Sequence, residues 1–162
     1  GKTTVGLQLA ARLERTFVDN DVVLESRTGH TAREIAAADG ADALHLHEAE
    51  ALVFALSSIV PAVVAAAAAA PMESFAAAVM SLHDVVYLRA TPPVLAARIA
   101  RAPDDGHRPF VADDARATLA AQFAAQFEAR DERYRALATL VVDADVERPE
   151  AVVDEISSAL AR

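Results

Sequence analysis

Apolar residues recur along this chain in two alternating patterns, one typical of amphipathic helices and one of short buried strands. The helical pattern predicts helices over residues 1–15, from 31, over 41–56, 72–82 and 92–102, from 113 or 114 to about 137, and from 149. The strand pattern predicts strands over residues 16–18, 62–66, 84–88 and 140–142. Strands that alternate with helices in this way predict an α/β fold, with a parallel sheet covered by helices on both faces.

Particular residues mark where some of these elements begin and end. Thr31 is followed three residues later by Glu34, which is the spacing of a capping box at a helix start. Pro149 suits the first turn of the final helix, where a backbone N–H has no helical partner. Residues 103–112 contain Pro, Gly and several charged side chains, and this composition predicts a loop between two helices.

No charged residue falls between Glu50 and Glu73, and an uncharged stretch of this length raises the question of a membrane span. Pro61 interrupts the stretch, serines occupy positions 57–58, and residues 65–70 are alanine, which is only weakly apolar. We interpret the stretch as the end of a helix, a turn and a buried strand, and we expect no membrane span.

Length and charge narrow the classes of protein further. The chain has 162 residues, a formal net charge of −9 at pH 7 and no cysteine. The length predicts a single domain over residues 1–162. The acidic balance argues against nucleic-acid binding, and the lack of cysteine excludes a disulfide framework and thiolate metal sites. No signal peptide is recognisable, and we expect a monomer in the cytoplasm.

The chain opens with Gly1-Lys-Thr-Thr4, directly before the apolar positions of the first predicted helix. This is the second half of the phosphate-binding pattern G-x-x-x-x-G-K-[ST]. Backbone N–H groups at a helix start bind phosphate oxygens, and the helix dipole adds to the attraction. In such a loop Lys2 reaches the β- and γ-phosphates and Thr3 ligates Mg²⁺. The motif predicts ATP and Mg²⁺ binding, and the alternative is an ordinary helix start.

A complete loop of this type follows a strand. Without that strand inside the sheet, its neighbours would leave buried backbone groups unpaired, at a cost of about 1–3 kcal/mol each. We therefore expect the natural chain to carry a central strand and the first half of the motif before Gly1. The strand around Val63 and Val64 and the strand over residues 85–88 are expected to flank its position without pairing with each other.

Two carboxylates, Asp19 and Asp21, follow the second predicted element, in the stretch Phe17-Val-Asp-Asn-Asp. The carboxyl end of a strand in an α/β sheet borders the cleft where ligands bind. One carboxylate could hold Mg²⁺ through water, and the other could orient or deprotonate a substrate hydroxyl. Asp-Asn-Asp is also favourable turn chemistry, so a polar turn is the alternative.

Taken together, the motifs resemble those of the shikimate kinase family, G-K-[ST]-T-x-G-x-x-L-A-x-x-L, then F-x-D-x-D, then R-x-G-x-[ST]-x-x-[ED]-I. In this chain the first two motifs read GKTTVGLQLAARL and FVDND, and the third lies within SRTGHTAREI. Asp39-Gly40 precedes a long helix, Arg108-Pro109-Phe110 resembles the family's lid motif, and Arg130 to Tyr134 resembles its R-x-x-x-Y. The motifs follow one another in order over essentially the whole chain.

The resemblance implies a P-loop kinase fold and an ATP- and Mg²⁺-dependent transfer of phosphate to a hydroxyl of shikimate. It implies catalytic roles for Lys2, Asp21 and Arg108, with Arg108 on a lid loop over about 103–112. It implies that the residues around ATP are Gly1, Lys2, Thr3, Thr4, Arg101 and Arg108. Metal contacts are implied for Thr3 and Asp19, and substrate contacts for Asp21, His45 and Arg130, the last on the substrate carboxylate.

The chain departs from the family pattern at two places in the predicted acceptor site. His45 stands where the family has a second carboxylate-binding arginine, and imidazole is charged only near or below about pH 6.5. The run from Ala65 to Ala70 stands where the family has Gly-Gly-Gly, so methyl groups are added beside the substrate. Both departures leave the nucleotide half of the predicted site better matched than the acceptor half.

Four interpretations therefore remain open from the sequence. The first is an active shikimate kinase, and the second is a kinase for another small hydroxylated acceptor. The third is a nucleotide-binding paralogue with little or no kinase activity, and the fourth is a decayed or truncated paralogue. Asp21, Arg108 and Arg130 favour the first two, whereas His45 and the alanine run favour the others.

Overall fold

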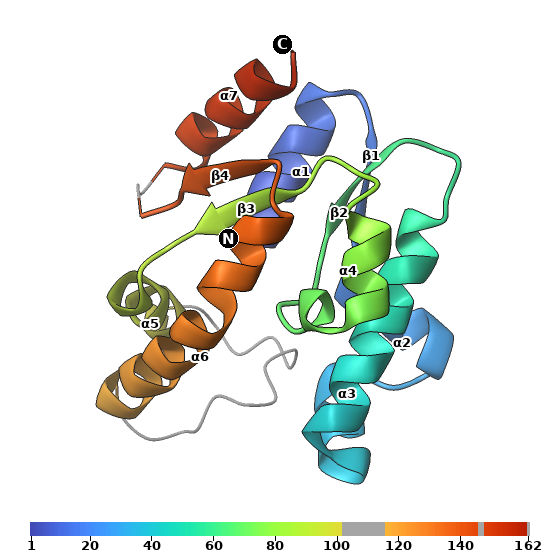
Figure 1. Ribbon diagram of the computed structural model, residues 1–162, viewed down its shortest axis with the longest axis vertical. Coiled ribbons are helices and arrows are strands. Elements are labelled where there is room, and N and C mark those ends of the chain that lie inside the picture. The colour runs from blue at the N-terminus through green and yellow to red at the C-terminus, as the bar shows by residue number, and fades with distance from the viewer. Residues whose placement is uncertain (102–115, 146–147, 162) are drawn as a thin grey trace.

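The computed structural model describes residues 1–101, 116–145 and 148–161, and its helices and strands alternate along most of the chain (Figure 1). The helices are α1 (Lys2–Arg12), α2 (Asn20–Thr28), α3 (Ala32–Leu56), η1 (Ala70–Met72), α4 (Ser74–Met80), α5 (Pro92–Arg101), α6 (Arg116–Leu137) and α7 (Pro149–Leu160). The strands are β1 (Thr16–Asp19), β2 (Ala62–Ala65), β3 (Val86–Arg89) and β4 (Leu140–Asp143). The predicted α/β class is confirmed, and the predicted loop over 103–112 lies outside the described residues.

The four strands form two parallel pairs. β1 pairs with β2, which places Asp19 opposite Ala65 at the carboxyl ends of the two strands. β3 pairs with β4, which places Arg89 opposite Asp143. β2 and β3 belong to different two-stranded sheets and do not pair with each other, as the sequence predicts. The carboxyl ends of β1 and β2 therefore meet at one edge, where the pair of aspartates begins.

Helices cover both faces of the strands. On one face, Val5 and Leu9 of α1 pack with Val142 of β4 and with three apolar residues of α7, and Val63 of β2 borders this cluster. On the other face, Val64 of β2 borders a cluster formed mainly by α3, η1 and α4. Neighbouring residues of one strand thus face opposite layers, as the period of two in a strand requires.

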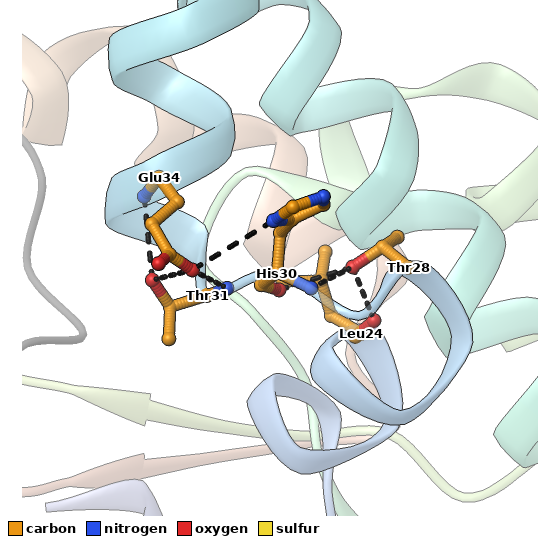
Figure 2. Close-up of polar contacts among 5 residues, drawn as sticks. All are labelled: Leu24, Thr28, His30, Thr31 and Glu34. Atoms are coloured by element: carbon orange, nitrogen blue, oxygen red, sulfur yellow. Dashed lines mark hydrogen bonds and ion pairs between the residues drawn. The ribbon is translucent and has the colours of Figure 1, made fainter.

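The start of α3 is held by the predicted capping box (Figure 2). The backbone N–H of Thr31 donates to Glu34 Oε2 at 2.7 Å, and the backbone N–H of Glu34 donates to Thr31 Oγ1 at 3.3 Å. The preceding turn is closed by Thr28, whose hydroxyl donates to the carbonyl oxygen of Leu24 at 2.9 Å. In the turn between α2 and α3, the backbone N–H of His30 donates to Thr28 Oγ1 at 3.1 Å.

α3 consists of two helical segments that meet at Gly40. Gly40 has φ 89° and ψ 177°, a backbone conformation that residues with a Cβ rarely adopt. The predicted helix starts at 31 and 41 correspond to these two segments. The uncharged stretch forms the end of α3, a turn, β2 and η1, and no helix in the described parts of the chain is long and apolar enough to cross a membrane.

Candidate active site

The start of α1 presents the predicted phosphate-binding residues at the surface. Gly1 is the N-cap of α1, and Lys2, Thr3 and Thr4 are exposed. The helix then packs closely on β1 at Gly6, where a Cβ would lie 2.5 Å from Cε2 of Phe17. This close approach, which only glycine permits without movement of the ring, places the first turn of α1 beside the end of β1.

Asp19 connects the first turn of α1 with the first turn of α2. The hydroxyl of Thr3 donates to Asp19 Oδ2 at 3.1 Å. The other carboxylate oxygen, Oδ1, accepts from the backbone N–H of Asp21 at 3.1 Å and thereby caps α2. The predicted site residues Thr3 and Asp19 are therefore in direct contact, and Asp21 lies in the first turn of the helix that Asp19 caps.

Asn20, between the two aspartates, is fully buried and fixes α2 against α3. Its Nδ2 donates to the backbone carbonyl oxygen of Glu48 at 3.1 Å. Its Oδ1 and the Oε2 of Glu48 are buried oxygens without a hydrogen-bond partner in the described part of the chain. Buried polar atoms of this kind are uncommon in folded proteins and often mark a functional site.

The carboxyl group of Glu48 lies where the predicted nucleotide and acceptor residues come together. Burial, with a further contribution from the negative charge of Asp21, raises the pKa of Glu48 to about 7. The positive charges of Arg130 and Lys2 oppose this shift. Charged residues of α1, α2 and α6 thus act electrostatically on one carboxyl of α3.

His45 lies one helical turn before Glu48 on α3 and is partly buried. Burial is the main cause that lowers the pKa of His45, and the positive charge of Arg130 lowers it further. Asp42 and Glu73 act in the opposite direction but do not outweigh these causes. The imidazole of His45 is therefore neutral at pH 7, so it does not replace the charge of an arginine.

The alanine run after β2 is held by α6. The hydroxyl of Tyr134 donates to the backbone carbonyl oxygen of Ala68, and Nε of Arg133 donates to the carbonyl oxygen of Pro71 at 3.2 Å. Burial raises the pKa of the Tyr134 phenol, and the nearby positive charge of Arg130 opposes the shift. Arg130, Tyr134 and the alanine run are thus neighbours at the acceptor side of the site.

The remaining predicted residues lie at the limit of the described structure. Arg101 is the last residue of α5, and its side chain is outside the described part. Arg108 and the predicted lid over 103–112 are also outside it, as is the predicted cap at Asp113 or Asp114. These predictions stay predictions.

The chemistry of Thr3 and Asp19 fits a magnesium ion shared with a nucleotide. No group of three or more His, Asp or Glu side chains suited to a metal occurs among the described residues. Mg²⁺ in phosphate-transfer sites is bound by one or two carboxylates together with substrate phosphates and water, so a larger protein cluster is not required. The hydroxyl and carboxylate oxygens at the contact between α1 and β1 are ligands of the type Mg²⁺ prefers.

Sequence reasoning overlooked Glu48. Glu48 follows His45 by three residues, and residues at this spacing share one face of a helix, so the helical pattern could have identified it. Sequence reasoning also assigned no role to Asp131. Its partners Arg89 and Tyr87 precede it in the sequence by 42 and 44 positions, respectively. No local spacing indicates a contact of that range.

A polar cleft of about 360 Å³ lies elsewhere, between α2 and α3. It is lined by Leu24, Arg27, Thr28, His30, Ile35, Asp39, His47 and Glu50. None of these residues belongs to the predicted site, and Thr28 and His30 take part in the hydrogen bonds that close the turn in Figure 2. We attribute the cleft to the packing of that turn, and the candidate site remains at Asp19 and Glu48.

Comparison with known proteins places the whole chain beside one family. The family model described as shikimate kinase matches residues 1–161. Shikimate kinase 2 of Escherichia coli O1:K1 / APEC is 35% identical over 165 residues, covering 100% of this chain and 90% of that protein. The shikimate kinase of Thermobifida fusca is 34% identical over 160 residues, covering 99% of this chain and 88% of that protein.

Solved structures show the same architecture. Shikimate kinase from Bacteroides thetaiotaomicron matches with a TM-score of 0.89 at 24% identity, covering 100% of this chain and 93% of that chain. Shikimate kinase from Acinetobacter baumannii, solved in complex with shikimate, matches with a TM-score of 0.82 at 24% identity, covering 99% of this chain and 87% of that chain. These likenesses show that the fold is shared.

Proposed function

From the premise that this chain belongs to the shikimate kinase family, we propose that it transfers the γ-phosphoryl group of ATP to a hydroxyl of shikimate. The observation that carries the proposal is the hydrogen bond from Thr3 to Asp19. It joins the phosphate-binding start of α1 to the carboxylate that ends β1. A nucleotide held at α1 then lies beside the only stretch of the described chain where two aspartates flank a buried asparagine.

In the proposed nucleotide half, the N–H groups at the start of α1 bind phosphate oxygens, beginning at Gly1 and including Thr4. Lys2 neutralises charge on the β- and γ-phosphates. Thr3 and Asp19 supply oxygen ligands for Mg²⁺, which when bound neutralises the charge that develops on the phosphates. Arg101 and Arg108 complete the ATP contacts, with Arg108 approaching from the lid predicted over 103–112.

In the proposed transfer step, Asp21 is the general base. The attacking hydroxyl oxygen forms a bond to the γ-phosphorus, the bond from that phosphorus to the β,γ-bridging oxygen breaks, and the hydroxyl proton passes to the Asp21 carboxylate. ADP and the phosphate ester are the products. Asp21 lies in the first turn of α2, where its position follows from the cap that Asp19 provides.

In the proposed acceptor half, Arg130 binds the carboxylate of shikimate. A guanidinium can form two parallel hydrogen bonds with a carboxylate, which fixes the orientation of the ring as well as its position. His45 lies close enough to Arg130 for the two to affect each other electrostatically, and it contacts the acceptor as a neutral side chain. We further propose that the chain acts as one domain over residues 1–162 and as a monomer in the cytoplasm.

Two observations favour the second candidate, a kinase for another small hydroxylated acceptor. His45 is neutral at pH 7, and the alanine run is fixed by Tyr134 and Arg133. The acceptor site is therefore less positive than the family pattern implies, and the alanine run adds methyl groups beside the proposed acceptor. Such a site suits an acceptor with a smaller ring or a weaker negative charge.

ATP turnover measured with and without shikimate separates the two candidates. The proposal predicts ADP release that depends on shikimate and saturates with it. Asp19→Asn should raise the Mg²⁺ concentration needed for half-maximal rate and leave the KM for shikimate little changed, because Asp19 is placed on the metal. Normal ATP binding without shikimate-dependent turnover would instead favour another acceptor.

A further inference from the structure

Asp131 connects α6 to strand β3. Its Oδ1 accepts two hydrogen bonds from β3, from the Tyr87 hydroxyl at 3.0 Å and from Nε of Arg89 at 2.9 Å. The side chain of Asp131 is only 18% exposed. Arg89 also lies over the ring of Phe127, 4.9 Å from its centroid, so a second residue of α6 takes part in the same junction.

One turn further along the same face, α6 reaches the segment after β2. Tyr134, one turn beyond Asp131, donates to the carbonyl oxygen of Ala68. The rings of Tyr134 and Tyr87 pack edge to face, with centroids 5.0 Å apart and planes at 75°. The contacts therefore run from β3 through Asp131 and the two tyrosines to the alanine run.

These contacts join parts of the protein that the backbone leaves apart, because β2 and β3 belong to separate sheets. Arg130, the proposed carboxylate ligand, directly precedes Asp131 on α6. We propose that Asp131 is a positioning residue that holds α6 between β3 and the alanine run, so that Arg130 and Tyr134 face the acceptor site. This inference rests on the proposed function only because it takes shikimate as the acceptor that Arg130 binds.

The charge of Asp131 strengthens the junction. Burial would raise its pKa, but the hydrogen bonds from Arg135, Arg89 and Tyr87 outweigh burial and lower the pKa of Asp131 below its usual value. The group is therefore ionised at pH 7. Hydrogen bonds from guanidinium and phenol groups to an ionised carboxylate are stronger than bonds between neutral groups.

The two carboxylate oxygens of Asp131 have different partners. Substitutions can therefore test its contact with β3 separately from its contact within α6. Oδ1 accepts from β3, whereas Oδ2 accepts from Nε of Arg135 on the same helix at 2.8 Å. Arg135→Ala removes the contact within α6 and leaves the contacts with β3. Asp131→Asn retains one carbonyl oxygen for β3, and Asp131→Ala loses every contact.

The steady-state KM for shikimate and for ATP, measured for these three variants, tests the proposal. Asp131→Ala should raise the KM for shikimate about ten- to a hundredfold and leave the KM for ATP little changed, because a small misplacement of a binding group has effects of that size. Asp131→Asn should restore most of the loss, and Arg135→Ala should resemble the wild type. Equal effects of Asp131→Ala and Arg135→Ala, or a parallel rise in both KM values, would overturn the proposal.

A second measurement does not depend on the acceptor. The chain contains two tyrosines and no tryptophan, so near-ultraviolet circular dichroism in the tyrosine band reports on the Tyr87 and Tyr134 pair. Asp131→Ala should weaken this band while Arg135→Ala retains it, and an unchanged band in Asp131→Ala would overturn the proposal. If wild-type protein shows no shikimate turnover, the proposed function fails and this measurement still decides the positioning role.

If Asp131→Ala does not fold, Tyr87→Phe provides the test. It removes one hydroxyl donor to Asp131 and retains the ring that packs on Tyr134. The KM for shikimate should rise by a smaller factor in the same direction, with the KM for ATP unchanged. A Tyr87→Phe protein with the wild-type KM for shikimate would contradict the proposal.

Discussion

The two halves of the candidate site are assembled in different ways. The nucleotide half comes from neighbouring elements at the start of the chain, where the exposed Thr3 contacts Asp19 and Asp19 caps the helix that carries Asp21. The acceptor half combines His45 of α3, Arg130 of α6 and the alanine run after β2. The first half depends on a local motif, whereas the second depends on how distant helices pack.

The halves also differ in their surroundings. Lys2 and Thr3 are exposed, so a bound nucleotide would meet side chains already in water. Glu48 and His45 are partly buried, and burial shifts the pKa of each toward its neutral form. Substitutions in the nucleotide half should therefore change the rate of transfer, and those in the acceptor half should change the pH dependence of binding and stability.

Among substitutions that affect one half of the site alone, the largest expected effect is in the nucleotide half. Lys2→Ala should lower kcat by about a hundred- to a thousandfold, because charge developing on the transferred phosphate loses a stabilising partner. Arg12→Ala is the matched control, since Arg12 lies on the same helix and forms an exposed ion pair with Asp154 at 2.8 Å. Rates measured by ADP release should fall for the first variant only. Turnover by Lys2→Ala at the wild-type rate would exclude the phosphate-binding role.

The next largest effect is expected on the free energy of unfolding and concerns Glu48, beside the acceptor half. Glu48 has a folded-state pKa of about 7, above the ordinary value of 4.5, so between these values the folded state holds a proton that the unfolded state has lost. The free energy of unfolding should therefore fall as pH rises from about 4.5 to about 7 and level off above that value. Glu48→Gln should remove this dependence and stabilise the protein at pH 8 by about 2–3 kcal/mol.

Urea unfolding measures the free energy of unfolding of the wild type and of Glu48→Gln between about pH 5 and pH 8. This range includes the folded-state pKa of Glu48, which is about 7. Glu50→Gln is the control, because Glu50 lies on the same helix but is exposed and pairs with His47. The same slope in the wild type and in Glu48→Gln would show that Glu48 is ionised in the folded protein and that our account of the acceptor half is wrong.

A smaller effect is expected at His45. Its pKa is lowered below 6.5, so its charge is present only in more acidic solution. The KM for shikimate should be lowest there and rise as pH approaches about 6.5, where the proton has been lost. His45→Arg should lower the KM at pH 7 about tenfold and flatten this pH dependence, because the guanidinium stays charged. A KM for shikimate that is unaffected by His45→Arg would favour a different acceptor.

The comparison of the two halves also explains what the sequence could predict. The helix that follows Gly1, the Thr31 capping box and the positions of all four described strands follow from contiguous residues, and the structure confirms these elements. Several helices and strands begin or end a few residues away from their predicted positions. The helix predicted over 72–82, for example, is shorter and is preceded by η1, in which Pro71 occupies the first turn.

The acceptor half was less accessible to prediction because its contacts are long-range. Tyr134 binds the carbonyl oxygen of Ala68, 66 positions earlier, and the buried carboxyl of Glu48 is influenced by charges from three other helices. The spacing from His45 places Glu48 on the same helix face, but no local pattern shows that its carboxyl is partly buried whereas Glu50 is exposed. The roles of Arg101 and Arg108 remain predictions from the family motifs.

The central claim is that Asp21 is the general base for phosphoryl transfer to shikimate, and the most direct test is this reaction in wild type and Asp21→Asn. ADP and phosphorylated shikimate are measured in one reaction, with ATP and shikimate binding measured separately. We predict that the wild type forms the two products in equal amounts. Asp21→Asn should bind both substrates but react about a hundred- to ten-thousandfold more slowly, because it lacks the base. Transfer by Asp21→Asn at the wild-type rate, or ATP binding by the wild type without any phosphorylation of shikimate, would contradict the account.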